Sequence, residues 1–101
     1  MNEAEIKLQN VFHNIVADLR FNYHYTLRTL LEVVTDMFDN ALHNDLDLDN
    51  LSNCGIDVLE MYNKHFFSLK KYYPIDEYHS NNTLFLGMLL ARLNVESNEI
   101  D

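Results

Sequence analysis

The segment from residue 83 to residue 94 reads TLFLGMLLARLN. Its apolar residues fall on nearly every side of a helix, which is typical of a central core element or of a helix shared with a second subunit. The apolar run 84–93 is ten residues long, and a bilayer span requires roughly 20. We expect a homodimer built partly on this helix, because its apolar surface exceeds what one side can bury in a small bundle. The predicted interface residues are Leu86, Leu89, Leu90 and Leu93.

Three further helices are predicted before this segment. Apolar residues recur at spacings of three and four within Glu3–Arg20, Tyr23–His43 and Cys54–Tyr73, and such spacings place them on one face of each helix. A break near Asn22 is expected, although the pattern also fits one kinked helix over residues 3–43. The polar stretches 43–53 and 74–82 are predicted loops. The predicted core face of the third helix consists of Ile56, Leu59, Tyr62, Phe66 and Leu69.

The composition supports an all-α fold. Only two Gly and one Pro occur in 101 residues, so long helices can form without a breaker and a turn-rich β fold is disfavoured. A hydrophobic fraction of 48% is ordinary for a globular protein. We therefore predict a single helical domain over residues 1–101, a bundle of three to four helices, with a frayed acidic tail from about residue 95.

Charge and cysteine content restrict the class of protein. The net charge of -9 disfavours nucleic acid and anionic membranes as partners. The N-terminus MNEAEIKLQN does not resemble a signal peptide, and the single cysteine, Cys54, is expected to be a small buried hydrophobe. These features predict a cytoplasmic protein, in the host cytoplasm if it is phage-encoded. Abundant Asn with scarce Ala and Gly is compatible with an AT-rich phage or mobile-element genome.

Acidic residues are concentrated in the middle of the chain. Between Arg28 and Lys64 the chain has eight acidic residues and no Lys or Arg. A region that carries only negative charge attracts cationic partners. The predicted partner-binding residues are Glu32, Asp36, Asp39, Asp45, Asp47, Asp49, Asp57 and Glu60.

One part of this acidic region resembles the start of an EF-hand calcium loop. Asp45, Asp47 and Asp49 alternate as the first three ligands of that loop do. The loop requires Gly at its sixth position and a bidentate Glu at its twelfth, where this chain has Asn50 and Ile56. The segment is therefore interpreted as a solvated acidic loop, and we predict no metal and no cofactor.

A second arrangement pairs carboxylates on two helices. Asp36-x-x-Asp39 and Asp57-x-x-Glu60 resemble the paired acidic motifs of the all-α nucleotide pyrophosphohydrolases related to MazG. That resemblance covers about a third of the chain and implies magnesium held by carboxylates, with the metal holding substrate phosphates. The first pair has Asp where that family mostly has Glu, and the second pair has Glu where that family has Asp. Magnesium-dependent hydrolysis of nucleotides is therefore the alternative function for this chain.

We expect a non-catalytic protein that binds a basic surface of a protein target. The chain has no His-Glu-x-x-His motif, no cysteine pair and no glycine-rich phosphate loop, so no catalytic residue is predicted. Acidic antagonists of nucleic-acid enzymes use such surfaces because their targets bind phosphate. Anti-CRISPR proteins, other phage inhibitors and nuclease-immunity proteins belong to this class.

Overall fold

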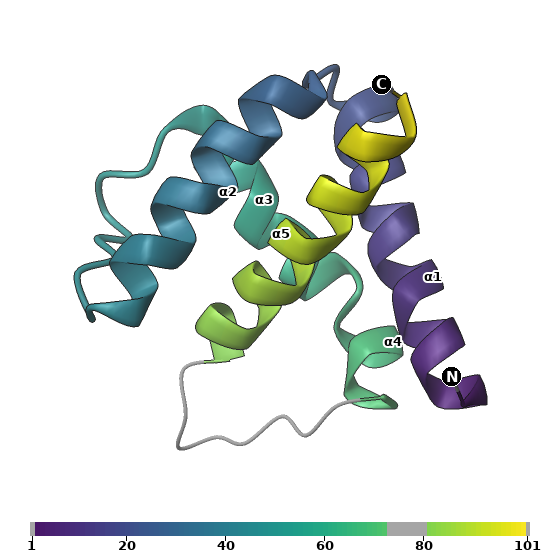
Figure 1. The fold of residues 1–101 in the computed structure, drawn as a ribbon. Coiled ribbons are helices and arrows are strands. Elements are labelled where there is room, and N and C mark those ends of the chain that lie inside the picture. The colour runs from purple at the N-terminus through teal and green to yellow at the C-terminus, as the bar shows by residue number, and fades with distance from the viewer. Residues whose placement is uncertain (1, 73–80, 101) are drawn as a thin grey trace.

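The protein is an all-α bundle, as the sequence predicts (Figure 1). The computed structural model describes residues 2–72 and 81–100. Within these residues the helices follow one another along the chain without an intervening strand. They are α1 (Glu3–Ala17), a π-helical turn η1 (Asp18–Asn22), α2 (Leu27–Leu42), α3 (Asn53–Lys64), α4 (Phe66–Lys70) and α5 (Asn81–Ile100). The predicted loop 74–82 lies largely outside the described residues.

The predicted break between the first two helices is present. The chain leaves α1 through the wider η1 turn, in which the Tyr23 amide donates to the Asp18 carbonyl. His24 then adopts a positive φ of 65°, which turns the backbone out of the helical path. Asn22 does not cap α2, because its side-chain amide donates to the Asp18 carboxylate at 2.5 Å. Thr26 caps α2 instead and accepts from the Thr29 amide.

Asp18 links this turn to the third helix. It is 8% exposed, and Lys64 Nζ donates to its Oδ2 at 2.6 Å. The hydrogen bonds from Lys64 and Asn22 hold the pKa of Asp18 below its ordinary value. The carboxylate is therefore ionised and paired at neutral pH, which satisfies a charge that burial would otherwise disfavour.

The predicted third helix is divided in two, and its predicted core face is confirmed only in part: Leu69 is fully buried, and Leu59 and Tyr62 pack against the core. The regular helix ends at Lys64, and His65 separates it from α4. Ile56 is 45% exposed, whereas Val58 and Met61 are fully buried. The physical reason is the small pair at residues 54–55, because a Cβ atom on Gly55 would lie only 3.3 Å from the sulfur of Met37. Small residues thus bring α3 close to α2, and the larger Ile56 points to solvent.

Helix α5 is the centre of the bundle. It packs against α1, α2 and α3, and Figure 1 shows it between α1 and α2. Phe85 is fully buried and lies against the rings of Phe12 and Tyr62. This packing confirms the sequence prediction of a central core element. No described helix is long and apolar enough to cross a bilayer.

The predicted dimer-interface residues of α5 lie mainly in this core. Leu86, Leu89 and Leu93 have no exposed surface, and Leu90 is partly buried against the same cluster. The first three leucines cannot present a surface to a second subunit in this conformation. Among the described side chains of α5, the large apolar ones that are exposed are Leu84 and Val95, on a different side of the helix.

The helix also continues past the expected start of a frayed tail. Helical structure extends to Ile100 rather than ending near residue 95. Glu96 is 6% exposed and accepts from Arg92 Nε at 2.9 Å. This pair, one helical turn apart, supports the helix itself, and His13 Nδ1 of α1 lies 3.4 Å from the same carboxylate.

Tyr25 provides a spectroscopic test of the packing between the α1–α2 connection and α3. Its hydroxyl donates to Asp57 at 2.5 Å, and this bond, with burial, raises the pKa of Tyr25 to about 12. Because the folded-state pKa exceeds the ordinary value of 10.0, the stabilisation is complete below pH 10 and is lost as pH rises through about 12.

We expect the tyrosinate absorbance titration to show one late phase that is missing in Tyr25→Phe. The same substitution should lower the free energy of unfolding at neutral pH by about 1 kcal/mol. Identical titration curves for the two proteins would contradict the assignment of this hydrogen bond.

Candidate functional site

The candidate site is a groove between α2 and the segment of residues 43–52, which we call the acidic groove. Its volume is about 410 Å³. Carboxylates line its walls, and neutral polar side chains, apolar groups and one glycine form the rest of the surface. The lining residues are Glu32, Val33, Asp36, Met37, Asn40, Asp45, Leu46, Asp47, Asn50, Leu51, Ser52 and Gly55.

The groove exists because the chain folds back along α2 after that helix ends (Figure 1). Asn44 adopts a φ of 57°, the left-handed conformation in which many helices terminate. The Asp45 amide then donates to the Asn40 carbonyl at 2.7 Å. Leu46 and Leu51 pack against the core, so the segment between them is held beside α2.

Asp47 shapes the far wall of the groove. Its carboxylate accepts from the Asp49 amide at 3.0 Å and from Asn50 Nδ2 at 2.6 Å. These two bonds form a local turn of the type that Asp favours. They also keep the pKa of Asp47 below its ordinary value, with the Asn50 bond as the larger cause. The carboxylate is therefore ionised at neutral pH.

Within the described residues, the carboxylates of the groove have little cationic compensation. Arg28 Nε lies 3.4 Å from Glu32, and both side chains are largely exposed. Asp36 accepts only a long contact of 3.5 Å from Asn40. Asp45 makes no side-chain ion pair in the described part of the chain. An exposed cation from a partner can therefore add charge interactions that the folded chain does not already contain.

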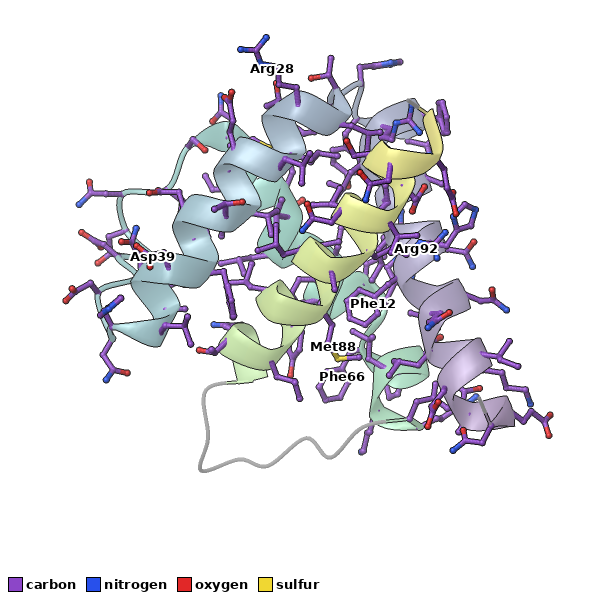
Figure 2. The ribbon with its side chains drawn as sticks, in the orientation of Figure 1. Phe12, Arg28, Asp39, Phe66, Met88 and Arg92 are labelled. Carbon is purple, nitrogen blue, oxygen red and sulfur yellow. The ribbon has the colours of Figure 1, made fainter. Side chains whose placement is uncertain are left out.

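A shallower acidic surface adjoins the groove on the outer side of α2. Asp39 lies there, on the side of α2 that faces away from α5 (Figure 2). It shares this surface with Glu32 and Asp36 and with apolar residues that include Phe38 and Leu42. His43 is the nearest basic group, and its Nδ1 lies 3.7 Å from Asp39. The predicted acidic face of α2 is thus continuous with the groove.

The structure does not bring all eight predicted residues together. Glu32, Asp36, Asp45 and Asp47 line the groove, and Asp39 borders it. Asp49 is exposed on the loop outside the lining. Asp57 and Glu60 are on α3 and do not line the groove, and Asp57 is bonded to Tyr25.

The two carboxylate motifs do not form a metal cage in the described part of the chain. No group of three or more His, Cys, Asp or Glu side chains is placed to hold a metal ion among residues 2–72 and 81–100. Asp57, from the second pyrophosphohydrolase-like pair, accepts a hydrogen bond from Tyr25. The calcium-like loop instead uses Asp47 to bind its own backbone.

Sequence reasoning did not identify the neutral residues of the groove. Asn40 and Asn50 contribute amides, and Val33 and Leu51 contribute apolar surface. Asn40 follows Asp36 by four residues, so helix geometry could have indicated a shared face. The apolar surface could not have been anticipated, because it depends on how closely α3 approaches α2.

Cys54 is a packing residue, as the sequence suggested. It is 6% exposed and belongs to the core cluster. Burial raises the pKa of its thiol to about 11, so the reactive thiolate is scarce at neutral pH.

No family model and no curated protein matches the chain, and no solved structure matches its fold. The geometry of the acidic groove is therefore the basis of the functional argument.

Proposed function

We propose that the protein is a non-catalytic antagonist that binds a basic surface of a protein target through the acidic groove. The supporting observation is the position of Glu32, Asp36, Asp45 and Asp47 around one hollow of about 410 Å³. The chain acts in the cytoplasm, as a phage or mobile-element inhibitor or an immunity protein does. This class is inferred from the acidic surface and from general physical chemistry.

The groove is chemically matched to an arginine or lysine side chain. Both have an apolar stem and a cationic end. Val33 and Leu51, which are only partly buried, offer apolar surface to the stem, while Asp36 and Asp45 offer charge to the end. Asn40 adds a side-chain amide that can accept a hydrogen bond. A flat acidic surface would attract the same charge, but it would not cover the stem.

The outer side of α2 extends the surface available to a target. Asp39 and its neighbours lie beside exposed Leu42, which is 56% exposed. Charge at the edge of an interface mainly accelerates association and selects the partner. Apolar contacts near its centre contribute more to affinity. The groove and this surface together provide both kinds of contact.

The proposal is tested with an oligoarginine peptide as the probe and an oligoglutamate peptide as the negative probe. We expect Asp36→Asn/Asp45→Asn to weaken oligoarginine binding about five- to tenfold, since two contacts of roughly 0.5–0.7 kcal/mol each are lost. The dependence of affinity on salt should become less steep. Isothermal titration calorimetry at two salt concentrations measures both effects.

The matched control is Glu3→Gln/Glu99→Gln, which removes two negative charges from exposed positions outside the groove. It has the same net charge as the groove variant. We expect less than about a twofold change in affinity, because distant surface charges are screened. Equal losses in both variants would show binding to net charge alone and would contradict a role for the groove.

The alternative, magnesium-dependent hydrolysis of nucleoside triphosphates, has weaker support. It requires Asp36, Asp39, Asp57 and Glu60 to act on one metal-bound substrate. No three of them are placed to hold one ion among the described residues. The resemblance in sequence spacing is thus the only feature in its favour.

A further inference from the structure

An apolar stripe runs along the exposed side of α5. It consists of Leu84, Met88, Ala91 and Val95, at spacings of four, three and four residues. These spacings place the four side chains on one face and are the spacings of a helix–helix seam. Leu84 is 42% exposed and Val95 is 46% exposed. None of the four belongs to the fully buried core.

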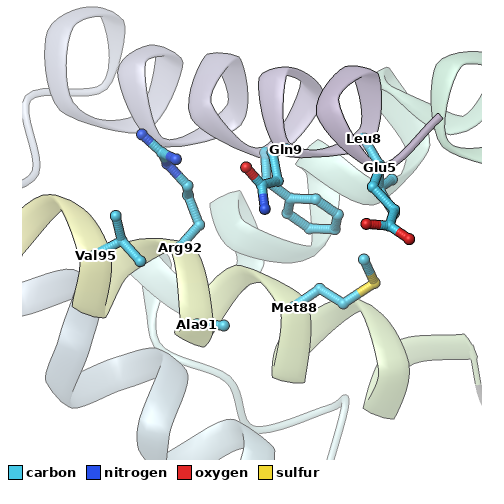
Figure 3. Close-up of a pocket in the computed structure, with 8 residues that line it drawn as sticks. Glu5, Leu8, Gln9, Met88, Ala91, Arg92 and Val95 are labelled. Carbon is cyan, nitrogen blue, oxygen red and sulfur yellow. The ribbon is translucent and has the colours of Figure 1, made fainter. Parts of the chain in front are cut away.

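The stripe borders a second groove, which lies between α1 and α5 (Figure 3). Its volume is about 340 Å³, and Leu8 and Phe12 contribute apolar surface from α1. Figure 3 shows Glu5 above Met88 toward one end and Arg92 beside Val95 toward the other. The groove therefore has an acidic end and a basic end.

We propose that a second copy of this chain covers this face, with the two α5 stripes packed antiparallel about a two-fold axis and the two α1/α5 grooves facing each other. This proposal goes beyond the binding of a basic target and uses a different face. A two-fold contact is the commonest way for identical chains to associate. Each α5 then supplies the apolar stripe that covers the stripe of the other copy.

Under this symmetry, groove residues of opposite charge from the two copies face each other. The two-fold rotation reverses the direction of α5 and keeps the α1 side of one copy opposite the α1 side of the other. The acidic end of one groove then meets the basic end of the second, so Glu5 lies opposite Arg92 of the second copy. Arg92 donates Nε–H to Glu96, and a guanidinium has four further N–H donors.

The sizes of the stripe residues are also complementary. In the antiparallel arrangement Leu84 lies opposite Val95 of the second copy, and Met88 lies opposite Ala91. A large side chain thus faces a small one at the centre, which allows close approach of the helices. Two copies of charge -9 repel each other. An interface on the acidic side of α2 would increase that repulsion, so electrostatics favours an interface on α5 instead.

Light scattering on the full chain tests whether this face associates. We expect a mass of twice 11.9 kDa at micromolar concentration, and dissociation at least about tenfold easier in Ala91→Glu, which buries a charge in the seam. The matched control is Asn10→Glu, an exposed residue of α1 outside the groove; it should leave the mass doubled. A mass of 11.9 kDa for the unmodified chain, or a dimer that Ala91→Glu leaves unchanged, would overturn the proposal.

Cysteine cross-linking tests the antiparallel direction. Leu84→Cys mixed with Val95→Cys should form a disulfide-linked heterodimer under mild oxidation, because these positions are opposed. Each variant alone should not cross-link, since its two cysteines would be about 16 Å apart along the helices, beyond the reach of a disulfide. Cross-linking of each variant with itself, without the mixed product, would overturn the antiparallel arrangement. Both positions are substantially exposed, so the fold should tolerate the changes.

Discussion

Phe85→Ala should lower the free energy of unfolding by about 3–5 kcal/mol. Phe85 has no exposed surface. Its ring centroid lies 5.7 Å from that of Phe12 and 5.3 Å from that of Tyr62. The substitution removes these aromatic contacts and leaves a cavity between α1, α3 and α5, which rigid helices fill only partly. Urea denaturation followed by circular dichroism measures the loss.

Ile56→Ala is the matched control. Ile56 is in α3, within the face that the sequence pattern had assigned to the core, but it is 45% exposed. We expect its loss to stay below about 1 kcal/mol, as for a residue with little buried surface. Similar losses for the two variants would contradict both the central position of α5 and the corrected core face of α3.

Arg92→Met should lower the free energy of unfolding by about 2–4 kcal/mol. The side chain of Glu96 is 8% exposed and accepts from Arg92 Nε at 2.9 Å. Removing the guanidinium leaves a buried carboxylate whose remaining basic neighbour is His13, at 3.4 Å. Methionine retains much of the apolar stem of arginine, so the loss of stability reflects the removal of the charge rather than the loss of packing. Denaturation in dilute solution separates this effect from self-association.

Two controls accompany this substitution. Arg28→Met removes an arginine from the same i, i+4 type of pair, but Arg28 and Glu32 are 90% and 70% exposed; we expect less than about 0.5 kcal/mol. Arg92→Met/Glu96→Leu should recover most of the stability, because it leaves no unpaired charge in the core. Equal effects of Arg92→Met and Arg28→Met would contradict a structural role for the pair.

The fold class and the centre of the bundle were predictable because they follow from helical periodicity. The apolar character of residues 84–93 predicts a core helix without knowledge of its neighbours. The face of α3 was not predictable in the same way, since large apolar residues were assumed to point inward. Gly55 lies close to Met37 of α2 and Cys54 beside it is buried, and the advantage of small residues depends on the distance between helices.

The end of α5 shows a local signal that was present in the sequence. Arg92 and Glu96 are four residues apart, a spacing that supports a helix. The polar composition of the last residues suggested a frayed tail instead. The burial of Glu96 depends on α1, and no local pattern contains that information.

The candidate site was predictable in its charge but not in its shape. The absence of Lys and Arg between Arg28 and Lys64 identified the acidic region. The hollow itself requires residues 43–52 to fold back on α2 through the Asp45–Asn40 backbone bond. Sequence spacing could not separate Asp57, which binds Tyr25, from the carboxylates that line the groove.

Backbone amide chemical shifts during titration with the oligoarginine peptide show whether a cation binds in the acidic groove, because they locate the bound cation without a substitution. We expect the largest shifts around Asp36, Asn40, Asp45 and Asp47, and we expect them to diminish together as salt is added. Largest shifts around Glu60 on α3, or along the α1/α5 groove, with the acidic groove unchanged, would contradict this binding site.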